Sequence, residues 1–312
     1  MRDKRNKITA KPPEREKGMN TLYIIGNGFD LAHELPTCYS DFHDWLQYSG
    51  FDSAKQFVDS IQGLTQDVNL WKSFEEALGS IDLPQYINCL IEEYVDIQKP
   101  DDWIAQSDSL YAGLKFEITK QYEELLTAFG EWACSIEMDN CEKLDCYESI
   151  NNPKNYFFTF NYTNTLEQIY NINNDRIMHI HGSATNINSS IILGHSHDYQ
   201  TDKGNVLEIL EETLPADSSD CGDLLLNLLN ISIKQTKKII CKNASYFNSL
   251  ANIGITRIIV LGHSYGEVDM PYFAKIREVC PNAQWELNCF SDDDKLAANK
   301  MITKLSLSAT II

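Results

Sequence analysis

The chain has 312 residues, 43% of them hydrophobic, and a formal net charge of −19. It is long enough to bury a sizeable core, and its charge argues against direct binding to nucleic acids or anionic membranes. No apolar run is long enough to span a bilayer and no signal-like segment opens the chain, so we expect a soluble, cytoplasmic protein. Nine cysteines without a C-x-x-C pair favour reduced thiols over a disulfide framework or a zinc ribbon.

Residues 1–18 are rich in Lys and Arg, contain Pro12-Pro13 and have almost no large apolar side chains. Such a segment buries too little apolar surface to offset the entropy lost on ordering, so a disordered basic extension is predicted. We expect residues 19–312 to form a single α/β domain.

Residues 22–30 (LYIIGNGFD) have the pattern of a buried strand that ends in a glycine turn. Gly26 and Gly28, with Asn27 between them, would leave backbone N–H groups free to bind a phosphate. Leu31 stands where the third glycine of G-x-G-x-x-G would be, so this is half of a dinucleotide fingerprint.

Helical periodicity dominates the next part of the chain. The spacing predicts a helix at 40–48 and a helical insertion at about 52–150, which includes helices at 71–78, 84–97 and 110–136. The insertion is longer than a simple βαβ crossover requires.

Strand patterns return in the second half of the chain, at 156–160, 176–180, 190–193, 256–261 and 284–290. Helices are predicted at 164–170 and 271–279, and a second helical segment at about 205–250 is broken by a loop at 215–222. This alternation predicts an α/β fold, Rossmann-like, with a mostly parallel sheet.

Four of these strands end in polar clusters, at 26–28, 161–163, 181–182 and 262–264. Ligands of open parallel sheets bind at the carboxyl ends of the strands. We therefore predict that the four clusters converge on one site.

Two motifs suggest other chemistry. Residues 262–266 match G-x-S-x-G, which would make Ser264 a hydrolase nucleophile, but that fold places its histidine after the serine and no histidine follows Ser264. The pairs His179/His181 and His195/His197 suggest a hydrolytic metal site, because alternate strand residues share a face. Further ligands lack a recognisable spacing, so we favour structural histidines, one catalytic histidine and no bound metal.

Five segments together resemble the AbiH family of bacterial antiphage (abortive infection) proteins. They are LYIIGNGFDLAHELPTCYSDF at 22–42, FFTFNYTNTLE at 157–167, HIHG at 179–182, IILGHS at 191–196 and VLGHSYGEVDMPYF at 260–273.

That family is in turn distantly similar to sirtuin-like NAD-binding proteins. The sirtuin pattern G-A-G-I-S-x-x-x-G-I-P resembles residues 26–36, where Glu34 replaces a glycine. The pattern T-Q-N-I-D resembles 159–163, where Thr163 replaces the aspartate, and H-G and G-T-S resemble 181–182 and 262–264. The sirtuin zinc module is absent, which argues against protein deacylation.

The resemblance implies a phage-defence effector that hydrolyses NAD, its substrate rather than a prosthetic group, to nicotinamide and ADP-ribose. It implies a nucleotide-binding role for Gly26, Asn27, Gly28, Asp30, Gly262 and Ser264. Asn161 would orient the ribose or a water molecule, and His181 would be the general base.

Two alternatives stay open at this point. One is a non-catalytic nucleotide-binding or interaction subunit of a defence complex, which the replacement at Thr163 favours. The other is a metal-dependent nuclease or nucleotide hydrolase. The expected partners are NAD or a related nucleotide and, to restrain a toxic enzyme, further copies of the chain or a second defence-system protein.

Overall fold

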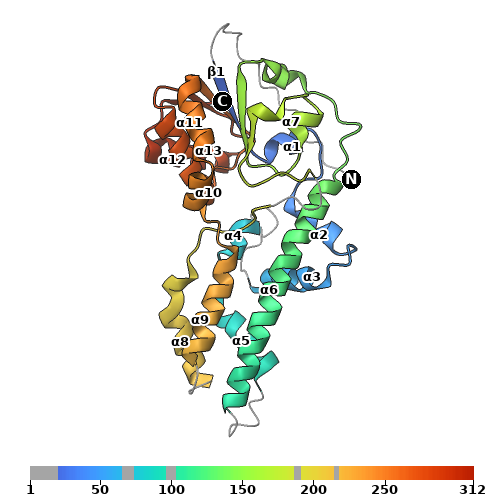
Figure 1. Ribbon diagram of the computed structural model, residues 1–312, viewed down its shortest axis with the longest axis vertical. Coiled ribbons are helices and arrows are strands. Elements are labelled where there is room, and N and C mark those ends of the chain that lie inside the picture. Colours follow the sequence, from blue (N-terminus) through green and yellow to red (C-terminus); the bar gives the residue numbers. More distant parts are fainter. Residues whose placement is uncertain (1–19, 65–73, 96–102, 186–190, 214–217) are drawn as a thin grey trace. The chain divides into compact units, whose positions relative to one another are not determined.

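A computed structural model describes residues 20–64, 74–95, 103–185, 191–213 and 218–312 (Figure 1). The chain divides into two compact units: unit 1 comprises residues up to 37, 133–185 and 236–312, and unit 2 comprises 38–132 and 186–235. The predicted extension at 1–18, Ser190 of the predicted strand at 190–193 and part of the predicted loop at 215–222 lie outside the described residues. That the chain forms a single domain stays a prediction.

Unit 1 is built on a six-stranded sheet with the strand order β3-β2-β1-β4-β5-β6, and every neighbouring pair is parallel. The strands are β1 (Asn20–Ile25), β2 (Asn155–Thr159), β3 (Ile177–His179), β4 (Ile255–Leu261), β5 (Gln284–Leu287) and β6 (Ala309–Ile311). The order reverses between β1 and β4, as in a doubly wound dinucleotide-binding sheet. The predicted Rossmann-like α/β class is therefore confirmed.

The helical segments of unit 1 connect these strands. They are α1 (Gly28–Ala32), η1 (Asp145–Asn151), α7 (Thr165–Gln168), η2 (Asn174–Arg176), α10 (Thr236–Lys242), α11 (Ala244–Ile253), η5 (Glu267–Asp269), α12 (Met270–Val279) and α13 (Asp292–Leu305). A capping box fixes the start of α13, where Ser291 accepts from the Asp294 N–H and the Asp294 carboxylate accepts from the Ser291 N–H.

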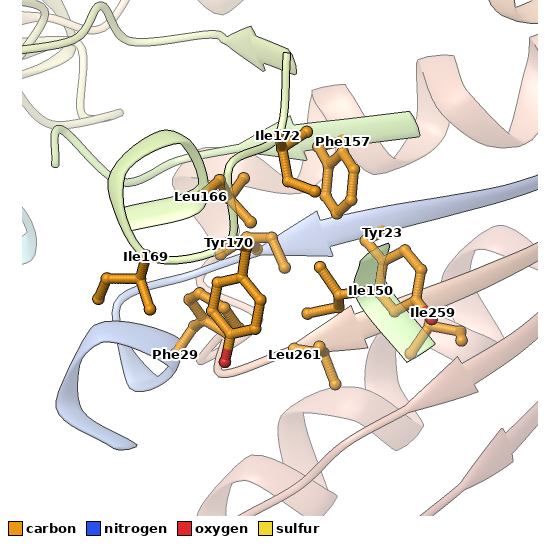
Figure 2. Close-up of a cluster of buried hydrophobic side chains, with 11 residues drawn as sticks. Tyr23, Phe29, Ile150, Phe157, Leu166, Ile169, Tyr170, Ile172, Ile259 and Leu261 are labelled. Atoms are coloured by element: carbon orange, nitrogen blue, oxygen red, sulfur yellow. The ribbon is translucent and has the colours of Figure 1, made fainter. Parts of the chain in front are cut away.

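One face of the sheet carries a compact apolar cluster (Figure 2). Tyr23 of β1 stacks on Phe157 of β2, with ring centroids 5.6 Å apart, and Ile259 of β4 belongs to the same cluster. Figure 2 shows Phe29 of α1 and Tyr170, which follows α7, in the same group. α1 and the α7 segment are therefore fixed against the carboxyl ends of the central strands by buried apolar contacts.

The opposite face is covered by helices that follow in the chain. Phe158, the next residue along β2, contacts Phe247 of α11 and Tyr272 of α12, with ring centroids 6.0 and 6.1 Å away. Adjacent strand residues point to opposite faces, so a run that is apolar throughout is buried on both sides. Unit 1 is thus a helix–sheet–helix sandwich.

Unit 2 is helical. It contains α2 (Tyr39–Leu46), α3 (Asp52–Leu64), α4 (Phe74–Leu78), α5 (Leu83–Tyr94), most of α6 (Trp103–Ser135), η3 (Tyr199–Asp202), α8 (Lys203–Thr213), α9 (Ser218–Leu229) and η4 (Asn230–Ser232). α3 buries residues at helical spacing, namely Ala54, Phe57, Val58, Ile61 and Leu64. Asp82 caps α5 by accepting the Gln85 N–H at 3.1 Å. Among the described residues, no helix has the length and apolar character needed to cross a membrane.

Two sequence-based expectations about elements are corrected, and one strand was missed. Residues 191–193 do not form the predicted strand; this segment leads into an isolated bridge between His195 and Ile233 in unit 2. The strand predicted at 284–290 ends at Leu287. β6 was not predicted, because its three residues are too short to show an alternating pattern.

Candidate functional site

The candidate site lies at the carboxyl ends of the central strands of unit 1, where the strand order reverses. Two turns meet there backbone to backbone: the Gly28 N–H donates to the Gly262 oxygen at 2.8 Å, and the Gly26 N–H donates to the Leu261 oxygen at 2.9 Å. A Cβ on Gly26 would lie 2.7 Å from the Gly262 oxygen, and a Cβ on Gly262 would collide with the Phe29 nitrogen. Close packing of the two turns therefore requires these glycines.

This packing corrects the expected use of the opening turn. The N–H groups of Gly26 and Gly28 already donate to carbonyls, so they are not free to bind a phosphate. Asn27 and Ser264 are exposed, and the Asn27 amide donates to the Thr37 oxygen at 2.7 Å. A role of any of these residues in binding a nucleotide stays a prediction.

Asp30 supplies the buried carboxylate of the site and is 1% exposed. The Thr163 hydroxyl donates to its Oδ2, and the Thr165 hydroxyl donates to its Oδ1 at 2.7 Å. Burial raises the pKa of Asp30 to about 6, although hydrogen bonds from Thr163, Thr165 and Asn161 act in the opposite direction. A carboxyl group that titrates near neutral pH is a feature of functional sites.

Asn161 follows β2 and is buried beside Asp30. Its Nδ2 donates to the Gly26 oxygen at 3.2 Å, and its side chain also hydrogen-bonds to the Asp30 carboxylate. Both partners are acceptors, so both N–H bonds of the amide are used. The Asn161 Oδ1 is then the atom that can accept a hydrogen bond from a sugar hydroxyl or a water molecule.

His179, at the end of β3, holds the backbone of the same segment. Its Nδ1 lies 3.1 Å from the Asn161 carbonyl oxygen, and its Nε2 lies 2.9 Å from Glu167 Oε1. The ring therefore bridges the Asn161 backbone and the Glu167 carboxylate. His179 and Glu167 thereby connect the ends of β2 and β3.

His181, two residues further on, is 2% exposed. Its Nε2 lies 3.3 Å from the Tyr272 hydroxyl and 3.9 Å from Asp269 Oδ1. The Phe160 ring packs against His181 and against His263, with ring centroids 5.4 and 4.5 Å apart. These contacts join the end of β3 to the end of β4.

Because Phe160 and Asn161 are consecutive, the end of β2 carries both groups of contacts. The structure thus brings the predicted residues Asp30 and Asn161 together at the ends of β1 and β2, and it places His181 just beyond the end of β3, against Phe160. Gly262 joins them through the turn after β4.

The second histidine pair lies in unit 2. The Nε2 of His195 lies 3.0 Å from the Ser232 hydroxyl, and burial lowers the pKa of His195 to about 4. His197 contacts Asp202 at 2.7 Å. Within the described ranges there is no group of three or more His, Cys, Asp or Glu side chains suited to a metal ion.

The serine hydrolase reading also lacks its geometry. Ser264 is exposed, and among the described residues no histidine forms a hydrogen bond with its hydroxyl. The neighbouring His263 is the buried residue of this turn and contacts Asp269 at 3.2 Å. Sequence reasoning took the serine from the motif and missed the histidine.

Other contributors to the site were also missed. Thr165, Asp269 and Tyr272 contact the predicted residues Asp30 and His181, and Glu167 contacts His179. They lie in 157–167 and 260–273, two of the segments that carry the family resemblance. A preference for polar residues within those segments would have found them.

Comparison with known proteins identifies one family. The model of the family described as "Bacteriophage abortive infection AbiH" matches residues 22–289, which include every element of the site. No curated protein and no solved structure matches the chain.

Proposed function

Because the chain belongs to the AbiH family of bacteriophage abortive infection proteins, and so has a role in phage defence, we propose that it hydrolyses NAD to nicotinamide and ADP-ribose. The observation that carries the proposal is the orientation of Asn161. Its N–H groups face Gly26 and Asp30, so its Oδ1 is left to accept from the ribose or from the attacking water.

The reaction defines what such a site must do. The C1′–N bond to nicotinamide breaks, its electron pair moves to the pyridinium nitrogen, and the ribose becomes oxocarbenium-like. Water bonds to C1′ and gives up a proton. The protein therefore has to orient the ribose, hold one water molecule and accept that proton.

The pair formed by Asp30 and Thr163 supports this assignment. In the sirtuin patterns the position of Asp30 is a serine and the position of Thr163 is an aspartate. Here the carboxylate and the hydroxyl have exchanged positions, and the Thr163 hydroxyl donates to Asp30. A carboxylate therefore still lies beside Asn161 despite the replacement at Thr163, which supports a role for this pair in orienting the ribose.

His181 is the proposed general base. It lies within 4 Å of a carboxylate and a phenol, Asp269 and Tyr272, which suit a ring that gains and loses a proton. Its burial limits access, so we assign it to a single water molecule held inside the site rather than to bulk solvent.

The test is nicotinamide release from NAD by purified protein, with and without an extract of phage-infected cells. We expect release by the wild type and a loss of at least about 100-fold in Asn161→Ala and His181→Ala. Glu267→Gln, at an exposed position that pairs with Lys304, is the control and should retain the wild-type rate. Equal rates in the wild type and His181→Ala would contradict the assignment.

A second function, nucleotide binding without cleavage, is favoured by one observation: the ring of His181, the proposed general base, is only 2% exposed. Titration calorimetry with NAD and with ADP-ribose distinguishes the two functions. Tight binding of NAD with no nicotinamide release under any condition would favour the binding function.

A further inference from the structure

His263, at the end of β4, has no role in the mechanism described so far, and Asp269 enters it only as a neighbour of His181. His263 and Asp269 are 7% and 9% exposed, and Tyr272 is fully buried beside them. Burying polar side chains costs free energy unless they are hydrogen-bonded, so the hydrogen bonds of His263, Asp269 and Tyr272 should show why they are buried together.

The protonation of His263 follows from its neighbours. The Tyr265 N–H donates to its Nδ1 at 2.7 Å, so this nitrogen is an acceptor. The proton of the neutral ring is then on Nε2, which donates to Asp269 Oδ2 at 3.2 Å. A neutral donor fixes the carboxylate in place without cancelling its charge.

The other carboxylate oxygen faces the proposed base. Asp269 Oδ1 lies 3.9 Å from His181 Nε2, and the Tyr272 hydroxyl lies 3.3 Å from the same nitrogen. One carboxylate thus contacts two histidines, His263 through Oδ2 and His181 through Oδ1. The Phe160 ring, packed on both histidines, keeps water away and strengthens the interaction.

We infer that Asp269 is a positioning residue for His181, and that His263 holds Asp269 in place. The inference rests on the proposed NAD cleavage. When the attacking water bonds to C1′, its proton passes to His181, and the charge of Asp269 stabilises the resulting imidazolium until the proton leaves to solvent. The bond that breaks is C1′–N, and its electrons leave with nicotinamide.

The groups that face His181 define the pH dependence. They are Asp269 and Tyr272 from η5 and α12, His263 from the end of β4 through Asp269, and Tyr162 from the turn after β2, whose ring centroid is 6.5 Å away. Asp269 is the acidic member of this set. Removing its charge should therefore make His181 harder to protonate.

The first test needs no substrate: the histidine ring nitrogens of the purified full-length chain are followed by NMR during a pH titration. In Asp269→Asn the titration midpoint of His181 should fall by about one pH unit or more. Glu267→Gln, in the same turn, is the control, since Glu267 is exposed and pairs at the surface with Lys304; its midpoint should match the wild type. An unchanged midpoint in Asp269→Asn would overturn the inference.

The second test is the pH profile of nicotinamide release. Asp269→Asn should lower kcat by about tenfold or more, leave KM unchanged and move the acid limb of kcat/KM to lower pH. Asp269→Glu should restore part of each effect. If Asp269→Asn fails to fold, Asp269→Ser carries the same expectations. If the titration midpoint of His181 shifts in Asp269→Asn but the wild type never cleaves NAD, the interaction between Asp269 and His181 is upheld and the proposed function is overturned.

Discussion

The tetrapeptide Leu-Gly-His-Ser occurs twice, at 193–196 in unit 2 and at 261–264 in unit 1. Both histidines are buried, yet their partners differ. His263 donates to the Asp269 carboxylate, whereas His195 contacts the Ser232 hydroxyl and the Leu229 carbonyl, which are neutral. The same four residues thus contribute to a charged centre in one unit and tie two loops together in the other. The partners that the fold supplies, rather than the motif, decide the role.

Both turns should depend on their glycines, which is the largest effect we expect. A Cβ on Gly194 would collide with the Ser232 oxygen, and a Cβ on Gly262 would collide with the Phe29 nitrogen. Gly194→Ala and Gly262→Ala should each lose more than about 3 kcal/mol in the free energy of unfolding. Gly254 has a positive φ but open space around it, so Gly254→Ala should lose only about 1 kcal/mol. Denaturant unfolding measures all three, and a wild-type midpoint in Gly262→Ala would contradict the packing.

The two units should respond differently to acid. Burial lowers the pKa of His195 to about 4, below the ordinary 6.5, so the folded state resists its protonation. The contribution of the neutral His195 ring to the free energy of unfolding is complete above pH 6.5. It is lost as the pH falls toward 4, by about 3 kcal/mol in total. His195→Gln keeps a donor near Ser232 and does not titrate, so its unfolding free energy should depend less on pH over this range. Parallel pH dependences of the two proteins would contradict this account.

Asp30 should show the opposite trend. Its pKa is raised from 3.8 to about 6 by burial, so the protonated form stabilises the fold. That stabilisation is complete below pH 3.8 and is lost as the pH rises through 6. The free energy of unfolding of Asp30→Asn, relative to that of the wild type, should therefore rise by about 3 kcal/mol between pH 4 and pH 7. Nicotinamide release by this variant should fall. A difference in unfolding free energy that does not vary with pH would contradict the ionised, buried carboxylate.

Substitutions of His263 and His195 test whether only the turn in unit 1 contributes to activity. His263→Asn keeps an acceptor for the Tyr265 N–H and loses the donor to Asp269. It should slow nicotinamide release by about tenfold. His195→Gln should leave the rate of the folded protein unchanged. Equal losses in the two variants, with equal thermal stability, would remove the distinction between the two turns.

The fold was largely predictable because buried parallel strands are apolar throughout. The runs at 22–25 and 256–261 were found in this way, and the strand at 156–160 by its aromatic residues. The segment at 190–193 has a similar pattern, but its neighbours in unit 2 offer a single bridge instead of a sheet edge. Local pattern cannot supply a partner strand.

The site was predictable only in part, for the same reason. Asn161 and His181 follow predicted strands, so their positions at the carboxyl edge of the sheet could be anticipated. Three features could not be predicted, because they depend on contacts between residues far apart in sequence. They are the charge on Asp30, its hydrogen bond from Thr163, and the link from His263 to His181 through Asp269. The engaged N–H groups of Gly26 and Gly28 depend on the turn after β4, more than 200 residues away, which the glycine spacing does not reveal.

The most direct test of NAD cleavage in phage defence is the NAD content of infected cells that produce either the wild type or His181→Ala at equal levels. NAD should fall after infection only in cells with the wild type, and only these cells should limit phage spread. Protection of the culture by the wild type with NAD unchanged, or by His181→Ala as well, would contradict it.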